Sequence, residues 1–267
     1  MAFFARSFTY DDTPSDKFEL FIISNGSSGV VEAKGSGSVE LYSEKIYRRV
    51  KPYLYGVQQT PVLEFSLSFA SFNPICAEKQ ALISKWLLGQ QTYKKLRICQ
   101  PDYQDVYFNC LLTNPRFNCV GNFAYSMVVD VICDSPFAWE EPRTISKTNI
   151  TSQITFDINN TSDLNDYVYP TCIFTLSGTS NGFEIKNNSL KYANGNIEMF
   201  AMTGLAPNEV ITVNSDLGII KSSLGINRFK NSTGTFFRMK PFINNISIGD
   251  DLAKLEIIYQ NARRVSA

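Results

Sequence analysis

Alternation of apolar and polar positions dominates the first half of the chain and predicts β-strands. The cleanest example is the stretch 63–69, whose odd positions are all large and apolar: Leu63, Phe65, Leu67 and Phe69. Because successive side chains of a strand point to opposite faces, this stretch buries one face of a sheet and turns the other towards solvent or a partner. A longer strand has one face made of Phe123, Tyr125, Met127, Val129, Val131 and Cys133. Shorter strands are predicted at 17–23, 30–33, 38–42, 94–99 and 106–112.

One segment of the first half has helical spacing instead. Asn73 is a favourable N-cap, Pro74 suits the first helical position, and Gly89 is placed to end the helix. The apolar residues between them fall on one side: Leu82, Ile83, Trp86 and Leu87. We therefore expect a single helix packed on a β-structure.

The second half has no comparable helical pattern and predicts a β-sandwich. Its predicted strands are short and evenly spaced: 153–158, 169–176, 183–186, 196–202, 209–214, 217–222, 235–240, 245–248 and 255–259. The breaks between them are rich in Asn, Gly and Ser, a pattern typical of sandwiches. The prediction is a mainly β protein of two domains. Residues 1–139 would form a β-barrel or sandwich with one packed α-helix, and residues 140–267 a second sandwich.

The composition permits a large core and narrows the chemistry. Of the 267 residues, 44% are hydrophobic and 13% aromatic, so a packed fold is expected. The 25 basic and 25 acidic residues balance and create no overall field that favours nucleic acid or an anionic membrane. Histidine is absent. This removes the usual general base near neutral pH, the triads that depend on it and the commonest metal ligand.

The cysteines and the first residues bear on the compartment. Residues 1–6 lack the apolar core of a secretory signal, and no apolar run approaches the roughly 18 residues of a membrane span. We expect a protein made in the cytoplasm and not inserted into a membrane. The six cysteines form no C-x-x-C pair: Cys76, Cys99, Cys110, Cys119, Cys133 and Cys172. Reduced, mostly buried thiols are expected, with no metal and no cofactor.

Residues 45–55 mix cations with aromatic rings. If they form a strand, one face carries Lys45, Tyr47, Arg49, Lys51 and Tyr53. Three interpretations are open: an ordinary polar strand face, an arm or sheet edge that docks on a neighbouring protein, and a nucleic-acid-binding stripe. Of the two functional interpretations, protein docking is favoured. The candidate interface residues are Tyr47, Arg48, Arg49, Lys51, Tyr53 and Tyr55.

The segment 133–140 divides the chain into halves of similar size. Pro136 removes a backbone donor and pushes Ser135 towards an extended conformation, so regular pairing should end here. Phe137 and Trp139 then supply two large apolar groups suited to pin an interdomain junction. Pro136, Phe137 and Trp139 are the candidate junction residues, and we expect anchors there, not a ligand platform.

Adjacent acids raise the question of glycoside hydrolysis. They occur at 11–12, 140–141 and 250–251. Neighbouring residues of a strand point to opposite faces, so such a pair does not aim at one bond, and solvated turn acids are the better explanation. A carbohydrate-binding module that recognises a cell envelope is a stronger candidate than a glycosidase. It rests on the aromatic content and the sandwich-like second half.

Seven short segments carry a family resemblance: 6–11, 86–89, 93–98, 135–139, 166–171, 204–209 and 259–263. Taken in order, they resemble the distal tail protein (Dit) family of long-tailed bacteriophages. The opening Arg-Ser-Phe-Thr-Tyr-Asp is similar to the start of that family, and Ser-Pro-Phe-Ala-Trp is similar to the end of its N-terminal domain. Each piece is short, and their order carries the resemblance.

The resemblance implies a non-catalytic hub in the virion, at the distal end of the tail. Its N-terminal domains would form a homohexameric ring that joins the tail tube to the baseplate or tail tip, and a galectin-like C-terminal sandwich would point outward. The implied partners are the tail tube protein and tail hub or tail-associated proteins, with a receptor-binding protein as a further candidate. Galectin sugar sites use histidine, and the turn 239–244 lacks the expected Pro-Gly-x-Asn form, so sugar binding in that mode is not expected.

Overall fold

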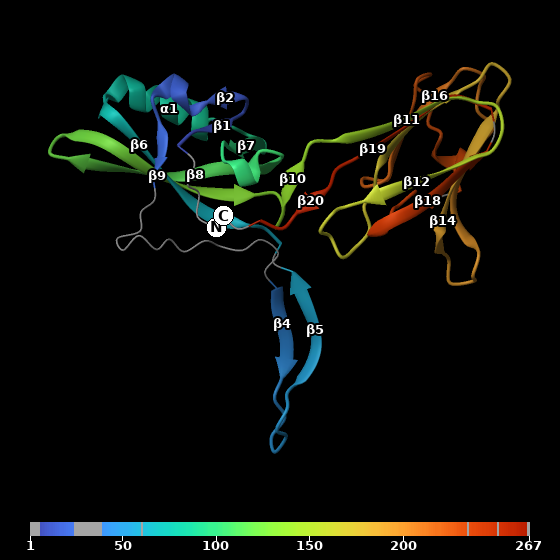
Figure 1. Cartoon of the computed structure of the whole chain (residues 1–267), viewed down its shortest axis with the longest axis horizontal. Helices are drawn as coiled ribbons and strands as arrows, with labels where there is room; N and C mark the ends of the chain where they lie inside the picture. The colour runs from blue at the N-terminus through green and yellow to red at the C-terminus, as the bar shows by residue number, and fades with distance from the viewer. Residues whose placement is uncertain (1–5, 24–38, 60, 234, 250, 266–267) are drawn as a thin grey trace. The chain divides into compact units, whose positions relative to one another are not determined.

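The computed structural model describes residues 6–23, 39–59, 61–233, 235–249 and 251–265. The chain separates into two compact units (Figure 1). Met1–Glu140 and Arg263–Ala267 form the first, here the N-terminal unit, and Glu141–Ala262 form the C-terminal unit.

The end of the chain belongs to the N-terminal unit, where the sequence prediction had placed it in the second domain. The cause is strand pairing: β20 (Ala262–Arg263) pairs with β10 (Ala138–Glu140). An ion pair of 2.5 Å joins the guanidinium of Arg263 to the carboxylate of Glu140. Both groups are largely shielded from water, which strengthens their attraction.

The N-terminal unit is built on one nine-stranded sheet. Its strands are β1 (Phe8–Tyr10), β2 (Thr13–Pro14), β3 (Phe21–Ile23), β6 (Glu64–Ile75), β7 (Lys94–Ile98), β8 (Val106–Val120), β9 (Phe123–Cys133), β10 and β20. The hydrogen-bonded order is β2-β1-β7-β8-β9-β6-β3, and β10 pairs with β8 beside β20. The predicted alternation is confirmed, because Leu63, Phe65, Leu67 and Phe69 all lie in the core of this unit.

The helix α1 (Ala77–Leu88) packs on this sheet through Trp86. The indole ring stacks on Phe18 at 4.7 Å and on Phe8 at 5.8 Å between centroids. Its Nε1 donates to the carbonyl of Tyr10 at 3.0 Å, so the polar end of the buried ring is also satisfied. This contact fixes the helix on β1.

The predicted helix exists, but its first turn was placed wrongly. The N-cap is Cys76, whereas Asn73 and Pro74 belong to β6. Ile75 is buried and pairs with Ala124 of β9, so the strand continues for three more residues before the helix begins. Leu82 was also placed wrongly, since it is exposed, while Gly89 does follow the last helical residue as predicted.

The C-terminal unit contains two antiparallel sheets. One has the order β11-β19-β13-β16-β17 and the other β12-β18-β14-β15. The strands are β11 (Arg143–Ile150), β12 (Ile154–Asn160), β13 (Thr171–Leu176), β14 (Gly182–Lys191), β15 (Ile197–Thr203), β16 (Val210–Asn214), β17 (Ile219–Ser222), β18 (Phe242–Gly249) and β19 (Leu252–Tyr259). Their inward residues form one hydrophobic core, in which Phe174 of β13 stacks on Phe183 of β14 at 3.8 Å. The predicted sandwich-like second half is therefore mainly β, as expected.

Two predictions for this half were wrong in detail. Residues 235–240 form no strand, and Met239 makes only an isolated bridge with Val168. The strand β11 was missed, because its residues alternate little in polarity and most are exposed at a sheet edge. In the N-terminal unit, residues 15–18 form a 3-10 helix, η1 (Ser15–Phe18), before the short β3, and the predicted strand at 30–33 lies outside the described residues.

A buried ion pair holds the loop after β17. The carboxylate of Glu209 accepts hydrogen bonds from the guanidinium of Arg228 at 2.8 and 2.9 Å, and also from Ser222 Oγ and the backbone of Ala206. Burial raises the pKa of Glu209, but the hydrogen bonds from Arg228, Ser222 and Ala206 outweigh this and lower it below its usual value. The loop is thus held by this ion pair and by the hydrogen bonds of Glu209.

Two further predictions concern thiols and membranes. All six cysteines are free, and three of them are buried: Cys110, Cys133 and Cys172. Cys76, Cys99 and Cys119 are exposed, so the expectation of mostly buried thiols holds for only half of them. Among the described residues, α1 is the only α-helix, and no helix there is long and apolar enough to cross a membrane.

Candidate protein-interaction surfaces

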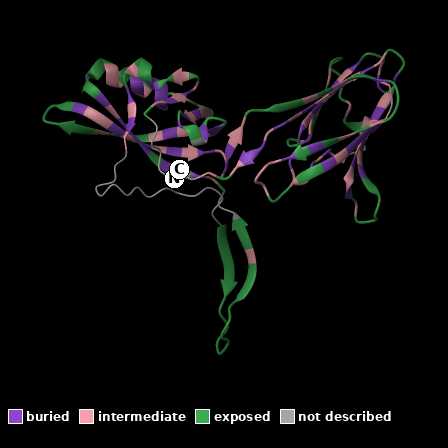
Figure 2. Ribbon diagram, in the orientation of Figure 1, coloured by how far each residue is buried: buried purple, intermediate pink, exposed green. Residues whose placement is uncertain are grey.

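The most exposed strands are those of one hairpin, made of β4 (Val39–Glu44) and β5 (Tyr53–Gln59). They pair antiparallel and form a sheet of their own, with no third strand among the described residues. Figure 2 shows both strands as almost wholly exposed, whereas the sheets of the two units have buried residues throughout. An isolated two-stranded hairpin is at best marginally stable in water, so these strands need a further surface to pack on.

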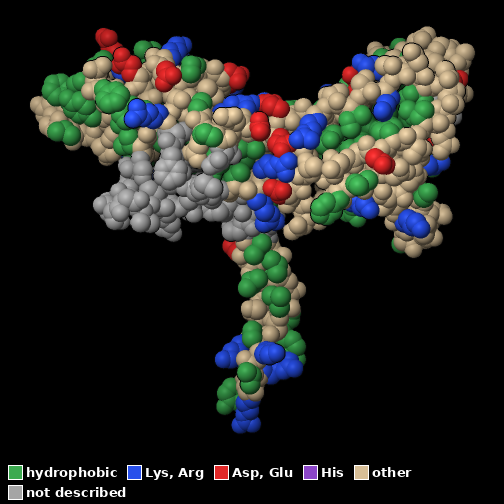
Figure 3. All heavy atoms as spheres, viewed as in Figure 1, with side chains coloured by type: hydrophobic (Ala, Val, Ile, Leu, Met, Phe, Trp, Pro, Cys, Tyr) green, Lys and Arg blue, Asp and Glu red, His purple; other side chains and the backbone are tan. Residues whose placement is uncertain are grey.

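One face of this hairpin is apolar. Leu41 and Val57 sit opposite each other in the register and are 65% and 54% exposed. Val39 and Leu54 are also exposed on these strands. Figure 3 shows hydrophobic side chains along the hairpin and Lys and Arg side chains gathered towards its turn. Exposed apolar groups in this number are typical of a protein-binding site.

The predicted interface residues lie at and beside the turn of this hairpin. Tyr47, Arg48, Arg49 and Lys51 fall in the connection between the two strands. Residues 45–53 therefore do not form the continuous strand that would place alternate residues on one face. Arg48 has a left-handed backbone, with φ of 69°, which turns the chain and breaks the alternation. Tyr53 and Tyr55 lie on β5, where the Tyr55 hydroxyl donates to Glu44 at 3.1 Å.

Two arginines of this turn lie over tyrosine rings. The guanidinium of Arg49 lies 4.1 Å from the ring centre of Tyr53, and that of Arg48 lies 5.4 Å from the ring of Tyr47. Tyr47 itself is 86% exposed. Stacking against Tyr restricts the arginine side chains, so they would lose less conformational entropy if they bound another protein.

The predicted junction residues lie where β9 gives way to β10. Pairing of β9 ends at Cys133, and Pro136 sits in the bend that follows, as the sequence indicates. Phe137 is buried, with the guanidinium of Arg264 at 5.5 Å from its ring. The indole of Trp139 donates to Asp134 at 3.3 Å. These contacts belong to the N-terminal unit, and they anchor β10.

A second apolar surface of the N-terminal unit was missed by the sequence reasoning. Phe72 of β6 is 83% exposed and lies 4.5 Å from Phe21 of β3, ring to ring. The two rings line a cleft of about 540 Å³ with Leu20 and Ile22, beside Arg6, Asp16 and Glu19. The signal was present in the alternation: the large apolar residues buried between 63 and 69 are odd-numbered, so the even-numbered Phe72 is expected on the outer face.

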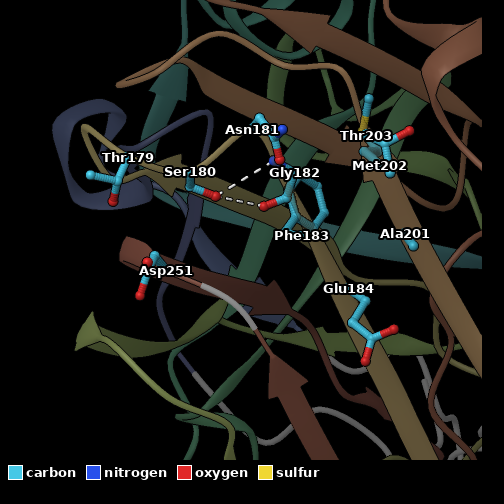
Figure 4. A pocket seen from close by; sticks show the side chains of 10 residues that line it. All are labelled: Thr179, Ser180, Asn181, Gly182, Phe183, Glu184, Ala201, Met202, Thr203 and Asp251. Carbon is cyan, nitrogen blue, oxygen red and sulfur yellow. Dashed lines mark hydrogen bonds between the residues drawn. The ribbon is translucent and has the colours of Figure 1, made fainter.

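A polar cleft of about 330 Å³ lies on the C-terminal unit (Figure 4). Its lining includes Thr179, Asn181, Glu184, Thr203 and Asp251. Ser180 donates to the carbonyl of Gly182 at 2.8 Å and shapes the rim. The one ring in the lining, that of Phe183, is buried in the core, so the cleft offers hydroxyl, amide and carboxylate groups but no aromatic platform.

The first residue of β18 presents another exposed ring that the sequence did not indicate. Phe242 has a left-handed backbone, with φ of 69°, and is 77% exposed. The side chain of buried Asn244 donates to the carbonyls of Lys240 and Phe242 and so holds this conformation. A bulky residue rarely adopts a left-handed backbone. Because Phe242 and Ile243 are adjacent and both apolar, the sequence shows no alternation of polarity from which the exposure of either side chain could be predicted.

Comparison with known families assigns both units. Residues 3–135 match the model described as the phage tail protein N-terminal domain, and residues 137–259 match the phage tail C-terminal domain. The chain belongs to this family of phage tail proteins. The two matches meet at the Pro136 bend, and together they span almost the whole sequence. No curated protein matches the chain.

Solved structures of phage tail proteins share the fold. The Dit protein of phage SPP1, described as a paradigm of the hub adsorption apparatus in phages that infect Gram-positive hosts, matches with a TM-score of 0.70. The match covers 95% of this chain and 98% of that one at 11% identity. A chain of the phage P2 baseplate in its activated conformation with Ca matches with a TM-score of 0.53 and 9% identity, over 96% and 97% of the two chains. At these identities the likeness establishes the fold of this phage tail protein.

Proposed function

We propose that this phage tail protein is a structural hub at the distal end of the tail, without catalytic activity. It would join the tail tube to the baseplate or tail tip and to its adhesion apparatus, and so reside in the virion. The observation that carries the proposal is the likeness to SPP1 Dit, a hub protein, over 95% of the chain. Membership of the phage tail family supports it independently of that likeness.

The proposed assembly is a closed ring of six copies built by the N-terminal units. The β4–β5 hairpin supports a role in that contact, because Leu41 and Val57 are exposed side by side on a face that needs cover. A ring requires heterologous contacts, in which one surface meets a different surface of the next copy. The cationic turn with Tyr47, Arg48 and Arg49 would form the polar rim of this contact.

In the same proposal the C-terminal unit is a galectin-like sandwich that points away from the ring. The tail tube protein and tail-associated proteins would bind the ring, and a receptor-binding protein is a further candidate partner. Pro136, Phe137 and Trp139 would then mark the hinge between the two units.

Native mass spectrometry of the purified full chain tests the assembly. We expect a closed oligomer of six copies, with little of any larger species, because a closed ring leaves no free contact surface. A chain that stays strictly monomeric at high concentration would contradict the ring as an intrinsic property of this protein.

The polar cleft favours one second candidate, a carbohydrate-binding module. Hydroxyl, amide and carboxylate groups such as those of Thr203, Asn181 and Glu184 are the groups that bind sugar hydroxyls. The full chain should then bind cell-wall glycans saturably, and Glu184→Gln should weaken binding while Glu78→Gln, on the exposed surface of α1, should not. Absence of saturable binding to purified cell wall would remove this candidate.

A further inference from the structure

Two buried cysteines occupy the same rung of the N-terminal sheet. Cys110 of β8 lies directly opposite Cys133 of β9 in the antiparallel register. The next rung is hydrogen-bonded, because the N–H of Asp134 donates to the carbonyl of Asn109 at 2.8 Å. Hydrogen-bonded and non-hydrogen-bonded rungs alternate in such a pair, so the cysteine rung is of the non-hydrogen-bonded kind. The N–H of Cys133 instead donates to Leu63, on the other side of β9, at 3.0 Å.

This rung has the spacing that a disulfide needs. The Cα atoms of a non-hydrogen-bonded pair are about 4.5 Å apart, and disulfides span Cα separations of about 4.4–6.8 Å. Residues opposite each other also project to the same face. For Cys110 and Cys133 this is the core face, since both have 0% exposure and belong to the same hydrophobic cluster.

The two thiols are also electrostatically coupled. Burial raises the pKa of Cys110 well above its usual value, and the neighbouring Cys133 and Asp134 raise it further. Burial likewise raises the pKa of Cys133, to about 12. Both thiols therefore stay protonated and shielded while the sheet is closed, and they become reactive only when β8 and β9 part.

We propose that Cys110 and Cys133 are a paired modification site that closes to a cross-strand disulfide when the protein meets a low-molecular-weight disulfide such as glutathione disulfide. One cysteine thiolate attacks a glutathione sulfur and releases the first glutathione. The second cysteine thiolate attacks the protein sulfur of this mixed disulfide and releases the second glutathione. The two cysteines are oxidised, the one glutathione disulfide is reduced, and the two thiol protons leave on the two glutathiones.

The bond would close the β8–β9 hairpin at its base, one residue before the bend that holds Pro136. Asp134, next to Cys133, accepts hydrogen bonds from Asn109 at 2.8 Å and from Trp139 at 3.3 Å. A covalent link here would tie together the strands from which the junction segment leaves. Loop closure of this kind stabilises a fold chiefly by restricting the unfolded chain.

Peptide mapping of the oxidised full chain tests the proposal. The exposed cysteines, Cys76, Cys99 and Cys119, are first blocked with iodoacetamide under native conditions. Glutathione disulfide is then added with increasing urea until Cys110 or Cys133 is modified. The expected main product is the linked pair of peptides that carry these two cysteines, two hydrogens lighter than the separate peptides and split by reductant.

Cys172 is the matched internal control, because it is buried and its cross-strand neighbours are Val213 and Ile257, not cysteines. It should stop at the glutathione mixed disulfide. In the variant Cys133→Ala, Cys110 should stop there as well; if this variant does not fold, the map of the parent chain still decides. The proposal is overturned if Cys110 and Cys133 end as two separate glutathione adducts, or if either links to Cys172.

Discussion

The β4–β5 hairpin and the sheets of the C-terminal unit are built from the same antiparallel pairing but treat their apolar residues in opposite ways. In β13, buried positions such as Phe174 alternate with half-buried ones. In β4, every residue is exposed, including Leu41 and Tyr42. The C-terminal sheets therefore complete their own core, whereas the hairpin presents apolar surface without covering it. The buried residues of the C-terminal sheets stabilise the fold of that unit, whereas the exposed residues of the hairpin are the ones that would contact another copy in the proposed ring.

The largest effect on folding is expected in the core of the C-terminal unit. Phe174→Ala removes a fully buried ring that stacks on Phe183 at 3.8 Å. The variant should lose about 3–5 kcal/mol of the free energy of unfolding of this unit. Urea denaturation followed by circular dichroism measures it. A loss below about 1 kcal/mol would mean that this ring is not part of a close-packed core.

A smaller effect is expected from the buried ion pair. Glu209→Gln leaves the guanidinium of Arg228 without its charge partner and should cost about 3 kcal/mol at neutral pH. The pKa of Glu209 is lowered in the folded state, so the parent loses this contribution as the pH falls through and below the ordinary value of 4.5.

The measurement for this pair is urea denaturation of parent and variant at neutral pH and at acid pH. Their difference should shrink on acidification, because protonated Glu209 no longer attracts Arg228. A difference that stays constant with pH would show that the charge of Glu209 is not responsible. Glu256→Gln, which removes a partly exposed carboxylate near Lys254, is the matched control and should change stability by less than about 1 kcal/mol.

Sequence reasoning succeeded where one face of an element is covered within the same chain. The alternation over 63–69 and the burial of Ile83, Trp86 and Leu87 follow directly from periodicity. It failed at the ends of elements, because pairing with distant strands decides where an element begins or ends. Ile75 pairs with Ala124, so β6 extends over the residues where the helix was expected to begin.

The candidate interface was only partly predictable. The residue types around Tyr47 and Arg49 indicated a docking segment, but the turn at Arg48 was not visible in the pattern. The apolar face with Leu41 and Val57 was not predicted. It depends on the register between β4 and β5, and the sequence of one strand alone does not specify that register.

At the junction we expect a moderate effect. Trp139→Ala removes a half-buried indole and its hydrogen bond to Asp134, and should cost the N-terminal unit about 2 kcal/mol. Trp139→Phe keeps most of the packing and should lose less. Calorimetry of both variants should show the transition of the C-terminal unit unchanged. If that transition shifts as much as the other, Trp139 stabilises both units and not only the strand that it anchors.

The smallest effect on folding is expected at the hairpin, together with the largest effect on assembly. The double variant Leu41→Thr, Val57→Thr keeps strand-forming side chains and removes exposed apolar ones, so unfolding of the units should change by less than about 0.5 kcal/mol. Light scattering should nevertheless show loss of the oligomer. Ile219→Thr, an exposed strand residue of the C-terminal unit, is the matched control and should leave the oligomer intact. Equal loss in both variants would contradict a specific role for the hairpin.

Electron microscopy of the purified full chain tests the central claim most directly. If the protein is a tail hub, the parent chain should form closed rings with a central opening, and the Leu41→Thr, Val57→Thr variant should form none. A field of separate, two-lobed particles from the parent chain at high concentration would contradict it.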